Sequence, residues 1–168
     1  MGLCLYFFFF STIFANIVKI EITEVTVRYD SFPVTILNKH NHYRRIHFAQ
    51  DLAWNNSLFE YASNFASQYN CSGILAHSGG PYGENIAIGY STSGAVSAWY
   101  NEGNDYKYGG ENVYNHFTAL VWNSSSQVGC AFKQCGDVWG KYIVCSYYPP
   151  GNVVGQALYN VFPPSPQR

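Results

Sequence analysis

Five cysteines constrain this chain more than any other feature of its sequence. One of them, Cys4, lies in the apolar run MGLCLYFFFFSTIFA of residues 1–15, which is too short to span a bilayer and ends in the small residue Ala15. Removal of this run as a signal peptide leaves Cys71, Cys130, Cys135 and Cys145. An even number of cysteines in a secreted chain predicts two disulfides, and three pairings are open.

The leader predicts a secreted, extracellular protein. The alternative interpretation of residues 1–15 is a buried N-terminal strand. No later stretch is long and apolar enough for a membrane helix, so we expect no stable insertion into a membrane. Three Asn-x-Ser sequons mark candidate glycosylation sites, which begin at Asn55, Asn70 and Asn123.

The composition fits one domain with an aromatic surface. A chain of 168 residues is the length of a single domain, and its net charge of −1 offers no electrostatic footprint for nucleic acid. Charged residues make up only 11% of the chain, whereas it has 15 Tyr and 12 Phe. Aromatic side chains in this number offer area for apolar ligands.

Residues 16–34 form an N-terminal extension with strand periodicity. Val18, Ile20 and Ile22 alternate with polar residues, and Pro33 ends the pattern. The extension is either an added edge strand or a loose propeptide.

Three helical patterns follow, over residues 35–48, 57–69 and 93–102, and Ser57 is a candidate N-cap of the second. In the third, Ala95, Ala98, Trp99 and Glu102 share one face. A glutamate on a buried face costs several kcal/mol unless it is paired or binds a ligand. Alternatively, Gly103 ends the helix and leaves Glu102 at its frayed end.

The last third of the domain is strand-like. Residues 127–133 and 141–148 predict two antiparallel strands joined by a turn at 135–140, an arrangement that can place Cys130 across from Cys145. Helices first and strands last indicate an α+β fold. The glycine-rich segment 73–89 predicts a mobile loop, and the proline-rich end at 163–168 predicts a disordered tail.

Five segments occur in a familiar order: LAHSGGPYGENIAIGY, AVSAWYNE, HFTALVW, QVGC and YIVCSYYPPGNVVGQ. They resemble the CAP superfamily (cysteine-rich secretory proteins, antigen 5 and pathogenesis-related 1), and in particular its fungal secreted PR-1-like proteins, known as pathogen-related in yeast. The resemblance implies a domain over residues 35–162 with an α-β-α sandwich, in which a three-stranded antiparallel sheet lies between helical layers. It also implies the disulfides Cys71–Cys135 and Cys130–Cys145.

The resemblance further implies a cleft with two histidines and two glutamates, which correspond to His77, Glu84, Glu102 and His116. Imidazoles and carboxylates suit a divalent cation such as Zn²⁺ or Mg²⁺. The alternative is a hydrogen-bonded polar cluster without metal. Two departures from the family pattern lie beside the cleft: Asn115 replaces a usual glycine, and Ala119 replaces a frequent glutamine.

Fungal members of the family bind sterols and fatty acids outside the cell and help to export them. The resemblance therefore implies a lipid-binding protein, with Tyr100, Tyr106 and Tyr108 at the ligand. A tyrosine supplies both a flat apolar wall and a hydrogen-bonding hydroxyl, which is what a sterol requires. The alternative is that these tyrosines form an ordinary wet surface, and Trp99 is expected in the core.

Two other functions remain as alternatives. One is a secreted protein-interaction or effector module, which no sequence feature excludes. The other is a metal-dependent hydrolase that uses the His/Glu cleft to activate water. The chain has no HExxH sequence and no nucleophile elbow, so we expect no enzymatic activity.

Overall fold

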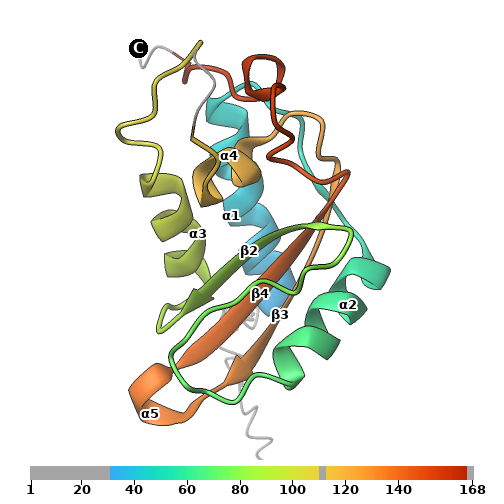
Figure 1. Cartoon of the computed structure of the whole chain (residues 1–168), viewed down its shortest axis with the longest axis vertical. Coiled ribbons are helices and arrows are strands. Elements are labelled where there is room, and N and C mark those ends of the chain that lie inside the picture. The colour runs from blue at the N-terminus through green and yellow to red at the C-terminus, as the bar shows by residue number, and fades with distance from the viewer. Residues whose placement is uncertain (1–30, 110–112, 166–168) are drawn as a thin grey trace, which may run out of the picture.

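The computed structural model describes residues 31–109 and 113–165, which form a sheet with helices on both faces (Figure 1). The predicted signal peptide and residues 16–30 of the predicted extension lie outside the described residues. Helix α1 spans Phe32–Ile46 and so begins inside the predicted extension. Pro33 lies in its first turn, where the missing N–H of proline costs no hydrogen bond, and it does not end a strand.

All three predicted helices are present, with shifted ends. The helices of the described residues are α1, α2 (Asn56–Ser67), α3 (Thr92–Asn101), α4 (His116–Val121), α5 (Gly136–Trp139) and the 3-10 turn η1 (Ala157–Tyr159). Asn55, and not Ser57, is the N-cap of α2, because its side chain accepts a hydrogen bond from the Leu58 N–H. No helix in the described ranges is long and apolar enough to cross a membrane.

The sheet of the described residues has four strands in the order β1-β3-β4-β2. They are β1 (Ala53–Trp54), β2 (Gly83–Ile88), β3 (Gln127–Gln134) and β4 (Lys141–Tyr148). The prediction of a three-stranded antiparallel sheet is wrong, because β1 adds a parallel neighbour to β3. A strand of two residues shows no periodicity in a sequence. The prediction of a mobile loop over residues 73–89 is also wrong in its second half, because residues 83–88 form the strand β2.

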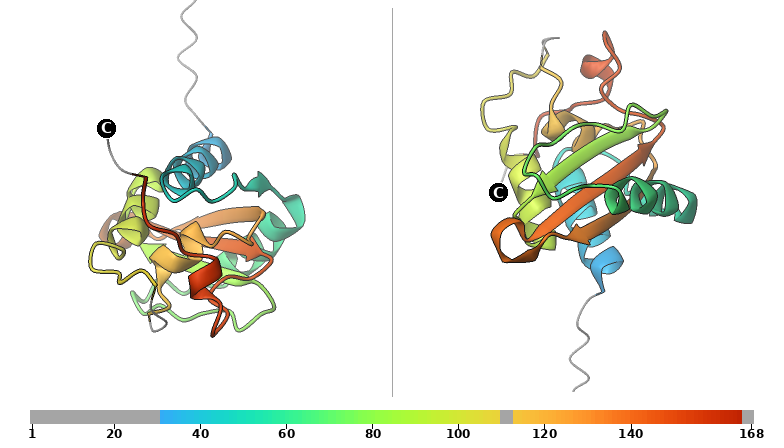
Figure 2. Two further views of the ribbon diagram at one scale, coloured as in Figure 1. Left: turned by 90° about the horizontal axis from the view of Figure 1, so that it is seen from above. Right: turned by 60° about the horizontal axis from the view of Figure 1, so that its bottom comes forward.

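Helices cover both faces of the sheet, as the predicted α-β-α layering requires. Along β4, Ile143 and Cys145 join one core with α1, α3 and α4, whereas Tyr142 and Val144 join a second core with α2. This alternation follows from the period of two in a strand. In the right view of Figure 2, α1 lies behind the sheet and α2 in front of it.

Both implied disulfides are confirmed. Cys130 and Cys145 are direct partners in the register of β3 and β4, and their Cα atoms are 4.1 Å apart. Cys71 and Cys135, with Cα atoms 5.4 Å apart, tie the segment after α2 to the end of β3.

A glycine in β3 allows α2 to pack directly on the sheet. A Cβ atom added to Gly129 would lie 2.1 Å from the backbone nitrogen of Phe59 in α2. No other residue type fits at this distance, which accounts for the glycine in the segment QVGC.

A buried histidine joins α1 to β4. His40 has no exposed surface, its Nδ1 lies 2.7 Å from the Ile36 carbonyl oxygen, and its Nε2 lies 2.8 Å from the Tyr147 hydroxyl. A carbonyl can only accept, so Nδ1 carries the proton and Nε2 accepts from Tyr147. Burial lowers the pKa of His40 to about 4, so the ring is neutral in the folded protein.

This histidine predicts a loss of stability in mild acid. The pKa of His40 is about 4 in the folded protein and 6.5 in the unfolded chain. Between these pH values the unfolded chain binds a proton at His40 and the folded protein does not, so a fall in pH favours unfolding. The free energy of unfolding should decrease by up to roughly 3 kcal/mol from this group, most of it between about pH 6.5 and pH 4. Urea denaturation at a series of pH values measures it. In His40→Gln the pH dependence should be flatter, and an unchanged slope would contradict the assignment.

Candidate functional site

The first half of the predicted tetrad is a histidine–glutamate pair at the start of β2. His77 Nδ1 lies 2.7 Å from Glu84 Oε1, which also accepts a hydrogen bond of 3.0 Å from the Ser78 N–H. The Glu84 side chain is only 6% exposed, whereas that of His77 is 63% exposed. The glycine-rich bend between them folds the loop back so that His77 meets the strand residue.

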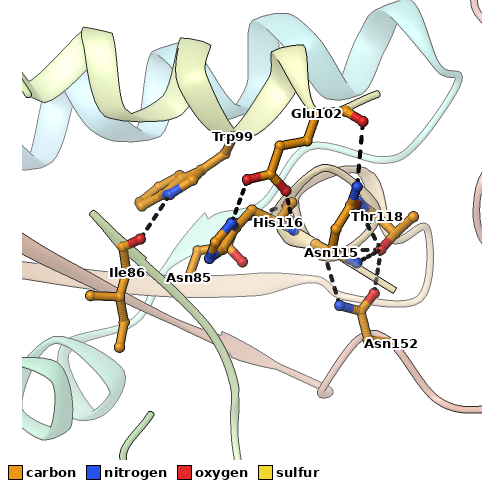
Figure 3. A network of polar contacts seen from close by, with 8 residues as sticks. All are labelled: Asn85, Ile86, Trp99, Glu102, Asn115, His116, Thr118 and Asn152. Atoms are coloured by element: carbon orange, nitrogen blue, oxygen red, sulfur yellow. Dashed lines mark hydrogen bonds and ion pairs between the residues drawn. The ribbon is translucent and has the colours of Figure 1, made fainter. Parts of the chain in front are cut away.

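The second half joins the end of α3 to the start of α4 (Figure 3). Glu102 is the C-cap of α3, its Oε1 lies 2.7 Å from His116 Nδ1, and its Oε2 accepts a hydrogen bond of 2.9 Å from the His116 N–H. Glu102 is therefore paired, as one interpretation of the sequence requires. Its side chain is 37% exposed, so the expected place on a buried helix face is wrong.

One cleft of about 350 Å³ brings both pairs together. Its lining consists of the four tetrad residues and of Asn85, Tyr114, Asn115 and Asn152. The Asn85 side chain donates a hydrogen bond of 3.0 Å to the His116 carbonyl and so fixes β2 to α4. The sequence placed Asn115 beside the cleft but did not indicate Asn85 or Asn152, because these come from β2 and from the loop after β4.

Asn115 explains how the chain tolerates its departure from the family pattern. Asn115 caps α4 through a capping box. Its side-chain oxygen accepts a hydrogen bond from the Thr118 N–H, and the Thr118 hydroxyl accepts a hydrogen bond from the Asn115 N–H. Its φ of −140° is extended backbone, so this turn does not need a residue that tolerates positive φ. Thr118 also donates a hydrogen bond of 2.7 Å to Asn152 (Figure 3). Ala119 is buried in the core.

The chemistry of the tetrad fits a divalent cation. Each histidine uses Nδ1 toward a carboxylate, which leaves Nε2 as the nitrogen for a metal, as in carboxylate–histidine–metal arrangements. Glu84 Oε2 is buried and has no hydrogen-bond partner among the described residues. A buried carboxylate oxygen requires a hydrogen-bond donor or a cation as its partner.

The two pairs do not form a collapsed four-ligand cage. Within the described ranges, the only group of three potential ligating atoms that lie within 4.8 Å of one another is His40, Cys130 and Cys145. Those two sulfurs form a disulfide and have no thiolate for a metal. A cation in the cleft would therefore need water or a shift of the side chains to complete its shell.

The three predicted lipid-contact tyrosines line one pocket of about 240 Å³. We call it the aromatic pocket, and its lining consists of His47, Tyr100, Gly103, Asn104, Tyr106, Tyr108, Phe117 and Pro164. Burial raises the pKa of Tyr106 and of Tyr108. The sequence did not indicate His47 or Pro164, because the end of α1 and the C-terminal segment reach the pocket only in the folded chain. The described start of the predicted disordered tail is held there, since Ser165 donates to the Ile46 carbonyl.

A buried histidine forms the polar floor of the aromatic pocket. His47 Nδ1 lies 2.7 Å from the Phe162 carbonyl oxygen and therefore donates to it, so Nε2 accepts from the Tyr100 hydroxyl at 3.1 Å. Burial lowers the pKa of His47. Tyr100 also stacks on Tyr43, with ring centroids 3.8 Å apart.

The three sequons differ in their surroundings. Asn55 caps α2 and donates to Gln127, Asn70 is exposed, and Asn123 is half-buried. Glycosylation at these positions stays a prediction.

Comparisons with known proteins agree on the family. A family profile described as "Cysteine-rich secretory protein family" (CAP) matches residues 37–147. The chain is 57% identical over 136 residues to the probable pathogenesis-related protein CaO19.2336 of Candida albicans, an alignment that covers 79% of this chain and 67% of that protein. It is 50% identical over 135 residues to the secreted protein RBT4 of the same organism, covering 77% of this chain but only 38% of RBT4.

The fold has relatives among solved structures. The crystal structure of NaASP2 with Zn²⁺ superposes with a TM-score of 0.56 at 21% identity, covering 78% of this chain and 84% of that one. At this identity the likeness shows the fold alone.

The hydrogen bonds that cap α4 predict how much the buried hydroxyl of Thr118 contributes to the free energy of unfolding. Thr118→Val keeps the shape of the side chain but leaves Asn152 and the Asn115 N–H without their partner, so the free energy of unfolding should fall by about 2 kcal/mol. Thr118→Ser keeps the hydroxyl and should lose only about 1 kcal/mol for the buried methyl group. Urea denaturation measures both. Equal losses in the two variants would contradict the role of the hydroxyl.

Proposed function

Because the chain belongs to the CAP family of cysteine-rich secretory proteins, we propose that it is an extracellular carrier of sterols and fatty acids that takes part in their export. The apolar leader, the two disulfides and the name of the secreted relative RBT4 support an extracellular location. The chain spans well under half the length of RBT4, so the proposal concerns this domain.

The observation that carries the proposal is the aromatic pocket. Its walls are the rings of Tyr106, Tyr108 and Phe117, and its floor is the hydrogen-bonded pair His47 and Tyr100. Flat apolar walls around a polar floor match a sterol, whose rings are apolar and whose single hydroxyl needs one partner.

The size of the pocket indicates how a sterol is held. At about 240 Å³ the aromatic pocket is smaller than the roughly 300–1,000 Å³ of sites that enclose a drug-sized ligand. We expect the hydroxyl end of the sterol to enter the pocket, while the rest of the molecule lies against the neighbouring loop.

We further propose that the tetrad holds a divalent cation such as Zn²⁺ or Mg²⁺. The carboxylate–histidine pairs and the buried Glu84 Oε2 support this. The cation would neutralise two carboxylates and link β2 to the facing ends of α3 and α4. We assign no catalytic step to the tetrad.

Sterol binding should depend on the aromatic pocket. Replacing two walls in Tyr106→Ala/Tyr108→Ala should weaken the binding of radiolabelled cholesterol by about tenfold or more, because the stacking area is lost. Tyr159→Ala is the matched control, since Tyr159 is 70% exposed and lines no part of this pocket. Unchanged binding by the double variant would overturn the assignment of the pocket.

Cation binding should depend on Glu84. Titration calorimetry with Zn²⁺ and with Mg²⁺ should show about tenfold or more weaker affinity for Glu84→Gln, since a neutral amide replaces a ligand or its orienting partner. Glu60→Gln removes the same charge from an exposed position on α2 and should bind as the unaltered protein does. Equal affinities in all three proteins would leave the tetrad as a hydrogen-bonded cluster.

A further inference from the structure

The outer edge of β2 presents free backbone groups. β2 is the last strand of the sheet and pairs only with β4. The Gly89 N–H donates to the Lys141 carbonyl at 3.0 Å, and backbone groups alternate in direction along an antiparallel strand. The N–H and C=O groups of Glu84, Ile86 and Ile88 therefore point away from β4.

Only one of these outward groups has a partner in the part of the chain that the structure describes. The Trp99 indole donates a hydrogen bond of 3.1 Å to the Ile86 carbonyl, as Figure 3 shows. The N–H groups of Ile86 and Ile88 and the carbonyl of Ile88 make no hydrogen bond to any described residue. An edge of this kind is a template for another strand.

An apolar groove of about 320 Å³ follows this edge. We call it the edge groove, and its lining consists of Leu75, Ile86, Ala87, Ile88, Tyr90, Ala98, Trp99, Glu102 and His116. Leu75 and Tyr90 are 43% and 47% exposed, so two large apolar side chains of the lining face solvent in the same groove. Glu102 and His116 also line the tetrad cleft, so the edge groove opens directly into it.

The end of the edge groove that opens into the tetrad cleft is lined by acidic side chains. Glu84 and Glu102 are the charged residues of the lining, and no lysine or arginine contributes to the edge groove or to the cleft. The Glu84 side chain is 94% buried, because only 6% of it is exposed, and its Oε2 lacks a donor among the described residues. A cationic group at this end would find two carboxylates.

We propose that the edge groove binds an extended peptide segment of a partner protein, which pairs with the free N–H groups of Ile86 and Ile88 and the free carbonyl of Ile88, leaves the Trp99–Ile86 hydrogen bond in place, and places a lysine or arginine at Glu84 and Glu102. The free backbone groups decide for a peptide over a lipid, because an acyl chain cannot satisfy an N–H or a carbonyl. Antiparallel pairing is the more stable form, and it places the C-terminal end of the peptide at the cleft. The inference does not depend on lipid carriage.

A synthetic probe tests this interaction directly. The probe is the peptide Val-Thr-Val-Thr-Val-Lys, with fluorescein at its N-terminus and an amidated C-terminus, and its binding to the full chain is followed by fluorescence anisotropy with EDTA present. EDTA is included because a divalent cation would compete for the same carboxylates. Saturable binding is the expected result. N-methylation of the peptide at alternate residues removes the donors that face β2 and should weaken binding by about tenfold or more.

Variants of the protein separate the groove from other surfaces. Leu75→Asp places a charge in the wall of the edge groove and should abolish binding. Leu158→Asp is the matched control, since Leu158 is 52% exposed and lies outside the groove. Replacing the terminal lysine of the probe by glutamate should also abolish binding, because the cleft is acidic.

Three results would overturn the proposal. They are no binding of the probe by the unaltered protein, equal binding of the N-methylated peptide, and equal losses in Leu75→Asp and Leu158→Asp. A dansyl-labelled fatty acid that binds the unaltered protein but not Leu75→Asp, while the peptide does not bind, would assign the groove to a lipid.

Discussion

The buried guanidinium of Arg44 holds together the parts of the chain that carry both sites. Arg44 has no exposed surface, and it donates to the carbonyl oxygens of Gln50, Leu120, Trp122 and Ser125 at 2.7 to 2.9 Å. Burial lowers its pKa to about 10, so the group stays charged at neutral pH. These four hydrogen bonds compensate for the water that the buried charge has lost.

The acceptors of Arg44 explain why its position matters. Leu120 lies in the last turn of α4 and Trp122 directly follows that helix, where carbonyl groups lack helical partners and favour a cation. Arg44 thus fastens the C-terminal end of α4 to α1. The N-terminal end of α4 supplies His116 to the tetrad cleft and Phe117 to the aromatic pocket. Both sites therefore depend on where this helix of six residues is held.

The C-terminal end of α3 also contributes residues to both the aromatic pocket and the tetrad cleft. Tyr100 faces the aromatic pocket and Glu102 faces the cleft, and Gly103 permits the close approach of Phe117, since a Cβ there would lie 2.5 Å from its ring. Two helix ends that meet thus supply neighbouring residues to opposite sides. The aromatic pocket and the tetrad cleft can be built this way in a small domain without any residue that lines both.

The resemblance carried by motifs in the sequence was enough to predict the two disulfides and the helices on both faces of the sheet. It also selected four residues that share one cleft and three tyrosines that share one pocket, whereas their roles toward a metal or a lipid stay predictions. The signal was a set of five segments that occur in this chain in the same order as in the family. What the sequence could not show depends on contacts between distant segments. β1 is too short for periodicity, β2 lay hidden in a glycine-rich loop, and His47 and Pro164 reach the pocket from residues far from the tyrosines. In the sequence Asn115 was only a replacement for a usual glycine, whereas in the structure it is the N-cap of α4.

The central claim is that the aromatic pocket, and not the tetrad cleft, holds the lipid. A crystal structure of the protein with cholesterol bound tests it most directly. The account predicts sterol density between Tyr106, Tyr108 and Phe117, with the hydroxyl within hydrogen-bond distance of the His47 and Tyr100 pair. Sterol density in the tetrad cleft or along β2, with the aromatic pocket unchanged, would contradict it.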